Sequence, residues 1–316
     1  MATINDFDRF FLNLPPFDRE DNFEEYWDNS LRTLKQIPIE PKYEHAKKSS
    51  HPGFNTYNIT YRSYNKAIVM GQLLIPDGVD RPKVVIVLGD YNQPMPYRGF
   101  PLDKTVAYFF LRLRGHELLL FDRNQGEEKP PSPGYMAENL IDRENFYVKG
   151  IYLDAYRAID MLRLKNLVDC SAVGYIGKGL GAAAALFAAS HSSRVRALVL
   201  DTPAFVYLNM SQNLSTGDTA NEINAFLAHH KIKNKAIKKN LTYFDALNFS
   251  DAISCPCLVT LGFKDNISPP ECIFALFNHL ICDKTIEVYP DEGNEAGGEK
   301  QFRKSVKWIS EILNRD

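Results

Sequence analysis

The sequence has no apolar run near the 18 residues that a membrane-spanning helix needs, and its opening, MATINDFDRFFLNLPPFDRE, lacks a basic segment followed by an apolar one. These absences argue against a membrane protein and against a secretory signal peptide. Neither sign of charge predominates, because 37 Lys and Arg against 39 Asp and Glu leave a net charge of −2. We therefore expect no nucleic-acid partner and no attachment to an anionic membrane.

Cysteine is scarce. The five cysteines are too few, too irregularly spaced and odd in number for a disulfide framework. Cys255 and Cys257 form the only close pair, with no second pair or histidine cluster at the spacing of zinc ligands. We expect a reducing, cytoplasmic compartment, no metal and no cofactor.

Short apolar stretches, by contrast, recur in a regular order. Lys83–Leu88 (KVVIVL) is typical of a buried strand, and segments with apolar residues at helical spacing lie between such stretches. The expected strands cover residues 57–61, 67–75, 83–88, 117–121, 173–177, 196–200, 257–261 and 285–289. The expected helices cover residues 22–37, 103–112, 149–164, 180–190 and 301–313. This alternation predicts a three-layer α/β domain with helices on both faces of a mostly parallel sheet.

Two segments depart from the alternation. Residues 1–50 predict an N-terminal helical extension to a main domain of residues 51–316. Residues 205–248 form an insertion, with a polar loop at 211–219 and a basic helical run at 229–240, HHKIKNKAIKKN. An insertion of this length indicates a lid or an oligomer contact. The basic run lacks aromatic residues for stacking bases, which favours a solvated helix face.

The stretch from residue 173 to residue 186 joins an apolar strand to an alanine-rich helix through a glycine-rich turn. Strand, tight turn and helix are the frame of a nucleophile elbow, G-x-S-x-G. In this frame the nucleophile position is Gly179, which has no side chain.

Several longer motifs stand in one order along the chain. They are Phe23-Glu-Glu-Tyr-Trp27, Gly89-Asp-Tyr-Asn92, Gly150-Ile-Tyr-Leu-Asp-Ala-Tyr-Arg-Ala158, Leu241-Thr-Tyr-Phe-Asp-Ala-Leu-Asn-Phe249, Leu261-Gly-Phe-Lys-Asp-Asn-Ile-Ser-Pro-Pro270 and Phe274-Ala-Leu-Phe-Asn278. Over residues 20–313 the chain resembles the acetyl xylan esterase/cephalosporin-C deacetylase family, which removes acetyl groups from xylo-oligosaccharides and related small esters. The resemblance implies an α/β-hydrolase fold and a homo-oligomer, since the family forms ring-like hexamers.

Three signatures of that family are altered here. R-G-Q reads Arg123-Asn-Gln125, G-x-S-Q-G reads Gly177-Lys-Gly-Leu-Gly181, and the C-terminal H-E pair reads Asn294-Glu295. By this resemblance Gly179 replaces the serine, Asn294 replaces the histidine, and Asp265 survives as the triad acid. The oxyanion donors would be the N–H groups of Leu180 and Tyr91.

Acyl transfer needs a nucleophile and a base, which glycine and asparagine do not provide. We therefore expect a degenerate esterase that binds a small ligand, such as an acetylated sugar, without classical hydrolysis. Two alternatives stay open: hydrolysis through a water activated by Asp265, and a structural or partner-binding subunit. Lys178 lies one residue before the nucleophile position and is expected to point away from it. If the pocket is intact, Gly179→Ser with Asn294→His should restore some activity.

Tyr91 and Asp265 also have ordinary structural interpretations. Tyr91 could be a packing aromatic, and Asp265 a residue that caps a turn. Arg123, Gln125, Lys178 and Glu295 are further pocket candidates on the strength of the family motifs alone.

Overall fold

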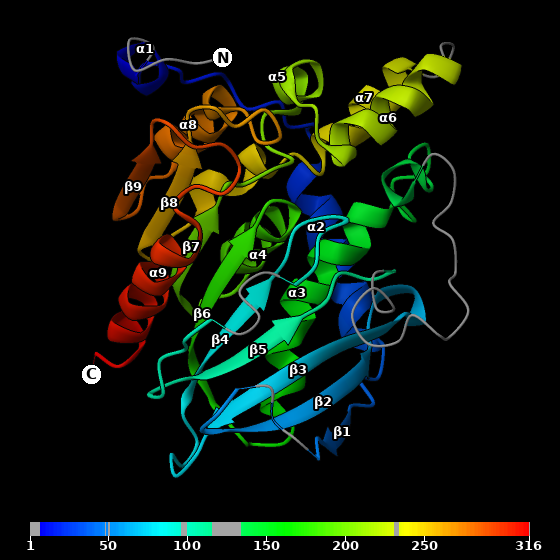
Figure 1. Ribbon diagram of the computed structural model, residues 1–316. Helices are drawn as coiled ribbons and strands as arrows, with labels where there is room; N and C mark the ends of the chain where they lie inside the picture. The colour runs from blue at the N-terminus through cyan, green and yellow to red at the C-terminus, as the bar shows by residue number, and fades with distance from the viewer. Residues whose placement is uncertain are drawn as a thin grey trace.

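A computed structural model describes residues 7–47, 49, 51–95, 100–115, 134–230 and 234–315 (Figure 1). Its strands are β1 Lys42–His45, β2 Phe54–Arg62, β3 Ile68–Pro76, β4 Lys83–Leu88, β5 Ala107–Leu111, β6 Asp169–Lys178, β7 Val195–Asp201, β8 Cys257–Gly262 and β9 Lys284–Tyr289. Its helices are α1 Phe7–Phe11, α2 Phe23–Gln36, α3 Tyr147–Arg163, α4 Leu180–His191, α5 Leu208–Leu214, α6 Asp218–His229, α7 Asn234–Thr242, α8 Pro270–His279 and α9 Gly298–Leu313. Short 3₁₀ turns occur at Tyr64–Lys66, Tyr135–Ala137 and Ala246–Ala252.

Within the described residues the strands form one sheet in the order β1-β2-β3-β5-β4-β6-β7-β8-β9. The β1–β2, β2–β3 and β3–β5 pairs are antiparallel, and every pair from β5–β4 to β8–β9 is parallel. The predicted three-layer α/β fold with a mostly parallel sheet is therefore confirmed. Parallel strands place their C-terminal ends along one edge, where sites of such sheets form.

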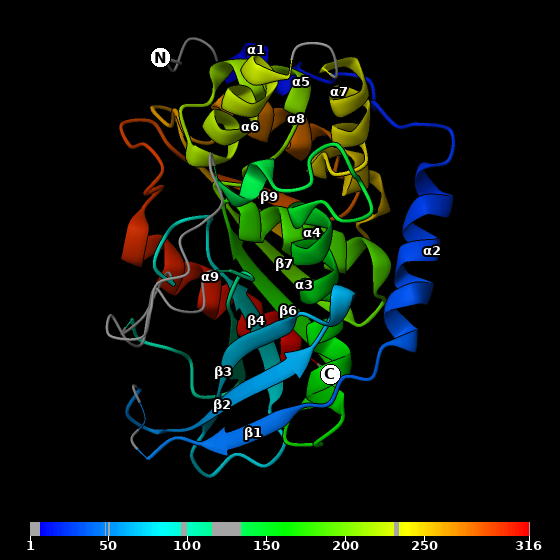
Figure 2. The same cartoon turned by 90° about the vertical axis from the view of Figure 1, so that its right-hand side faces the viewer.

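The central strands β4, β5 and β8 are buried on both faces of the sheet, which explains why they are continuously apolar. Along β4, Ile86 faces the core formed with α2, α3 and α4, whereas Val85 and Val87 face the core formed with α9. Helix α9 contributes an apolar row at helical spacing to this second core: Phe302, Val306, Ile309 and Leu313. Figures 1 and 2 show α9 on one face of the sheet and α2, α3 and α4 on the other.

The prediction of a helix at residues 103–112 is wrong, because this segment contains β5. Ala107–Leu111 pairs with β3 on one side and with β4 on the other. A short apolar run such as AYFFL fits a buried strand and a buried helix equally well by periodicity. Pairing with two neighbouring strands decides in favour of the strand. The strand expected at residues 117–121 lies outside the described residues.

The N-terminal extension packs into the main core. Trp27 of α2 is fully buried, its ring lies 4.5 Å from that of Phe187, and its Nε1 donates to Tyr243 O at 3.0 Å. The strand β1, which the sequence analysis did not anticipate, adds the outermost antiparallel strand. Residues 7–47 are thus tied to the α/β core by the helix and by the strand.

The insertion at residues 205–248 carries α5, α6 and α7, which lie together at one end of the molecule (Figures 1 and 2). The polar loop expected at 211–219 is limited to residues 215–217, since α5 extends to Leu214 and α6 begins at Asp218. Ser211 and Gln212 are buried there, so these polar residues face the protein interior. In the basic run, Ile237 is buried while Lys235 and Lys238 are exposed, the pattern of a solvated face on α7. No described helix is both long and apolar enough to cross a membrane.

Candidate active site

The turn between β6 and α4 brings the expected nucleophile position to the C-terminal edge of the sheet. Gly179 has φ +54° and ψ −121°, a positive-φ conformation that glycine adopts more readily than other residues. Its N–H donates to Asp201 O at 3.0 Å, and its carbonyl accepts from Ala204 N–H at 3.1 Å. A β-carbon on Gly181 would lie 2.4 Å from Gly89 O, so α4 approaches the end of β4 closely. The strand, turn and helix of an elbow are therefore present, around a residue without a side chain.

The carboxylate of Asp90 fills the space beside Gly179. Asp90 follows the end of β4, and its Oδ1 accepts the N–H of Tyr91 at 2.7 Å and the N–H of Leu180 at 2.8 Å. A β-carbon built on Gly179 would lie 1.9 Å from both Cγ and Oδ1 of Asp90 and 2.3 Å from Oδ2. The two N–H groups expected to serve a substrate oxygen thus share one acceptor from the chain itself.

Burial sets the protonation of this carboxyl group. Asp90 is only 9% exposed, and desolvation raises its pKa from 3.8 to about 6. The N–H groups of Leu180 and Tyr91 and the charge of Lys178 oppose this rise, while the charge of Asp265 adds to it. Asp90 therefore titrates close to neutral pH.

Asn294 and Asp265, which the family resemblance places at the base and acid positions, lie together. Nδ2 of Asn294 donates to Asp265 Oδ2 at 2.9 Å and to Thr202 Oγ1 at 3.3 Å. Oδ1 of Asp265 accepts the N–H groups of Ile267 and Ser268 at 2.8 and 2.9 Å. Burial raises the pKa of Asp265, against these hydrogen bonds. The acid orients an amide, which cannot take up a proton near neutral pH.

Lys178 joins the elbow to the loop that carries Asn294. Its Nζ donates to Asn294 O at 2.8 Å, to Asp201 Oδ2 at 3.2 Å and to Thr202 Oγ1 at 3.3 Å. The side chain thus engages β7 and the Asn294 loop, a contact with the site that its position before the elbow did not suggest.

Tyr91 connects the end of β4 to the insertion. Its hydroxyl donates to Glu222 Oε2 on α6 at 2.8 Å, and the same oxygen accepts Met136 N–H at 3.0 Å. Beside this contact, Asn92 Nδ2 donates to Asp218 Oδ2 at 3.0 Å. These hydrogen bonds hold α6 against the strand end, so Tyr91 contributes to the site through its backbone N–H and to the contact with the insertion through its hydroxyl.

Glu295, among the other candidates, does not join this cluster. Glu295 follows Asn294 but is exposed, and backbone N–H groups of its own loop hold its pKa below the usual value. Arg123 and Gln125 lie outside the described residues. Within the described part of the chain, no group of three His, Cys, Asp or Glu side chains is arranged to hold a metal ion.

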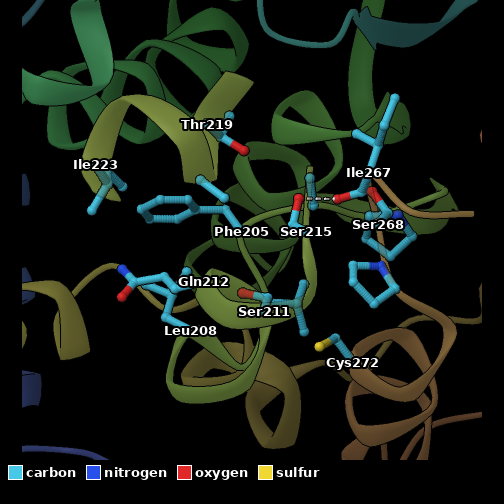
Figure 3. Close-up of a pocket in the computed structure, with 15 residues that line it drawn as sticks. Phe205, Leu208, Ser211, Gln212, Ser215, Thr219, Ile223, Ile267, Ser268 and Cys272 are labelled. Atoms are coloured by element: carbon cyan, nitrogen blue, oxygen red, sulfur yellow. Dashed lines mark hydrogen bonds between the residues drawn. The ribbon is translucent and has the colours of Figure 1, made fainter. Parts of the chain in front are cut away.

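A pocket lies between the insertion and the strand ends (Figure 3). It encloses about 340 Å³ of space, including the part open to solvent. Its walls come from α5, α6, the loop after β7 and the start of α8: Pro203, Ala204, Phe205, Val206, Leu208, Ser211, Gln212, Ser215, Thr219, Ala220, Ile223, Ile267, Ser268, Pro269 and Cys272. Figure 3 shows the hydrogen bond from Ser215 Oγ to Ile267 O, at 2.6 Å, which joins the insertion to the loop after Asp265. The pocket therefore borders the site through Ile267 and Ser268.

Three residues of the site escaped the sequence analysis: Asp90, Thr202 and Glu222. A signal existed for Asp90, since a carboxylate directly after a buried strand of a parallel sheet lies at the functional edge. Thr202 is likewise a polar residue directly after a buried strand, β7, at the same edge of the sheet. Glu222 had none, because only folding of the insertion brings α6 to Tyr91.

The model of the acetyl xylan esterase family (AXE1) matches residues 15–312, nearly the whole chain. The chain belongs to this family. Among curated proteins it is 23% identical to the acetyl esterase Axe7A of Xylanibacter ruminicola over 299 residues, which is 91% of this chain and 66% of that relative. The chain thus spans slightly less than two thirds of its relative's length.

Solved structures of family members share the fold. The acetyl xylan esterase from Paenibacillus sp. R4 superposes with a TM-score of 0.86 at 23% identity, covering 97% of this chain and 99% of that one. Acetyl xylan esterase 1 from Thermoanaerobacterium sp. JW/SL YS485 gives 0.82 at 19% identity, covering 98% of both chains. The predicted α/β-hydrolase fold is confirmed by these family members, and homology supports an esterase-like function.

Proposed function

We propose that this member of the acetyl xylan esterase family has lost Ser-His-Asp hydrolysis and retains a site that binds a small molecule. The observation that carries the proposal is the elbow itself, where Gly179 provides the backbone of the turn and no nucleophile. A two-step acyl transfer begins with attack by such a nucleophile, so its first step has no reactant on the protein.

The arrangement at the base position supports the same proposal. Nδ2 of Asn294 donates to Asp265, so this amide acts as a hydrogen-bond donor to the acid and does not act as a base. Removing triad members leaves only the rate that binding and the oxyanion hole supply. With both groups replaced, we expect hydrolysis of acetyl esters no faster than an unspecific protein surface allows.

The ligand class we propose is an acetylated sugar or a similar small ester, held between the insertion and the strand ends. The pocket under α5 and α6 supports this, since its apolar lining is interrupted by the hydroxyl groups of Ser211 and Thr219. We further propose a homo-oligomer, by analogy with the family, and light scattering of the purified chain tests that assignment.

The deciding experiment is turnover of p-nitrophenyl acetate by the unmodified protein, compared with buffer and with albumin at equal protein concentration. We expect the protein to match albumin. Turnover well above albumin would overturn the proposal and would favour hydrolysis by a water activated at Asp265, whose raised pKa suits a base. That case has its own control, because Asp265→Asn should then abolish the turnover.

A further inference from the structure

Asp90 accepts the hydrogen bonds that an oxyanion hole donates to its ligand. Two backbone N–H groups from different elements, the end of β4 and the start of α4, converge on one oxygen at 2.7 and 2.8 Å. Preorganised donors at this distance from a negative oxygen are the geometry that stabilises a developing oxyanion. Here the oxygen belongs to a carboxylate of the chain.

The same carboxylate occupies the volume that a side chain at position 179 would need. Separations of 1.9 Å and 2.3 Å from a β-carbon on Gly179 to the Asp90 carboxyl atoms are far below van der Waals contact. Backbone atoms surround the turn closely, as the 3.0 Å hydrogen bond from Gly179 N–H to Asp201 O illustrates. A side chain at position 179 and the Asp90 carboxylate in its observed position therefore exclude each other.

We propose that Asp90 is an internal ligand of the former catalytic centre, whose carboxylate occupies the oxyanion hole and closes the centre to substrate. This inference rests on the proposed function and adds a filled oxyanion hole to the replacements at Gly179 and Asn294. It also identifies the chemical class of ligand that the hole binds, a small carboxylate. In this protein that carboxylate is a side chain of the protein itself. The pair Gly179→Ser and Asn294→His is consequently insufficient to restore hydrolysis, because the serine would overlap Asp90.

The first test measures carboxylate binding directly. Asp90→Ala empties the hole, whereas Asp90→Asn keeps it filled with an uncharged group of equal size. We expect sodium acetate, compared with sodium chloride at equal ionic strength, to raise the melting temperature of Asp90→Ala by at least about 2 °C in a saturable manner. The unmodified protein and Asp90→Asn should show no such rise.

Equal responses of the three proteins to acetate would overturn the inference. If Asp90→Ala does not fold, Asp90→Gly is measured in the same way. Recovery of either variant in folded form only from acetate buffer would support internal ligation. Failure of both variants to fold with and without acetate, while Asp90→Asn folds, would overturn it, since then the carboxylate site has no affinity for a free carboxylate.

The second test compares two sets of substitutions in the p-nitrophenyl acetate assay. The double variant Gly179→Ser, Asn294→His retains Asp90, and the triple variant adds Asp90→Gly. Removing one oxyanion donor from an esterase-type centre typically lowers the rate 10²–10³-fold, so we expect the triple variant to be at least about 100-fold faster than the double. A double variant that fails to fold beside a folded triple variant would support the same conclusion.

Equal rates in the two folded variants, whether high or absent, would overturn the inference. Failure of the proposed function looks different, because it is turnover by the unmodified protein. If Asp90→Asn then abolished that turnover, Asp90 would be a catalytic residue and both conclusions would be wrong. The acetate titration needs no activity and so separates the two conclusions.

Discussion

Oδ1 of Asp90 lies 1.9 Å from the point at which a β-carbon on Gly179 would stand, so the side chains of residues 90 and 179 compete for one volume. The acid follows β4 and the glycine follows β6, two neighbouring parallel strands. Because the C-terminal ends of such strands meet at one edge, a change at either position alters the space of the other.

Gly179→Ala is expected to destabilise the protein more than the same substitution at Gly298, another glycine with a positive φ. Gly298 has φ +47° and nothing within 4 Å of its missing β-carbon, so Gly298→Ala measures the backbone strain alone, about 1–2 kcal/mol. Gly179→Ala adds the overlap with Asp90, and overpacking of this kind costs about 1–3 kcal/mol more. Urea unfolding of both variants measures the difference. In an Asp90→Gly background the excess should disappear, and an excess that persists there would contradict the shared volume.

Asp90→Asn is expected to change how stability depends on pH. The pKa of Asp90 is raised in the folded protein, from 3.8 to about 6, so its contribution to stability is fully present below pH 4 and is lost as pH rises through 6. The charge of Lys178 lowers the pKa of Asp90 and so reduces this loss of stability, whereas the charge of Asp265 raises the pKa and increases the loss. Since one pKa unit corresponds to about 1.4 kcal/mol, the stability of Asp90→Asn relative to the unmodified protein should increase by roughly 2 kcal/mol between pH 4 and pH 7. Urea unfolding across this range checks it, and a pH-independent difference would be evidence against a buried, titrating Asp90.

Tyr91→Phe is expected to loosen α6 without unfolding the core. The variant loses the hydrogen bond from the Tyr91 hydroxyl to Glu222, worth about 1 kcal/mol, so local opening of α6 should become roughly fivefold more frequent. Hydrogen exchange of amides in Asp218–His229, followed by mass spectrometry, measures this opening. Tyr156→Phe, which removes a partly exposed hydroxyl on α3, is the control and should leave exchange in α6 unchanged. Equal exchange in the two variants would mean that the hydrogen bond from Tyr91 to Glu222 does not hold α6 in place.

Trp27→Ala is expected to destabilise the whole protein by about 3–5 kcal/mol, as truncation of a buried aromatic does. Trp27 is fully buried, and its indole nitrogen donates to Tyr243 O. Leu12→Ala, at a side chain 84% exposed in the same N-terminal segment, should change stability by less than about 0.5 kcal/mol. Thermal unfolding of both variants tests the prediction. Loss of α2 alone, in a separate transition, would show that the extension folds independently of the core.

Much of the sheet was predictable, because its strands are short apolar runs bounded by turns. Lys83–Leu88 agrees with β4 at both ends, and the expected strand at residues 257–261 differs from β8 by one residue. The helix expected at residues 103–112 was wrong because AYFFL has no period that separates strand from helix, and its two partner strands are distant in the sequence. Likewise, buried Ser211 and Gln212 in α5 resemble loop residues until the pocket around them is known.

The sequence by itself determined that residue 179 has no nucleophile and residue 294 no imidazole, since both facts concern residue type. It also determined the family, through motifs spread along the whole chain. Only the tertiary structure decided what fills the site, because Asp90, Gly179 and Leu180 meet through the pairing of β4 with β6. The Asp90 carboxylate accepts the N–H of Tyr91, its neighbour in the chain, and the N–H of Leu180, which lies 90 residues further on. Such a pair of contacts cannot be inferred from the local sequence pattern. Its role follows from the convergence of strand ends in space.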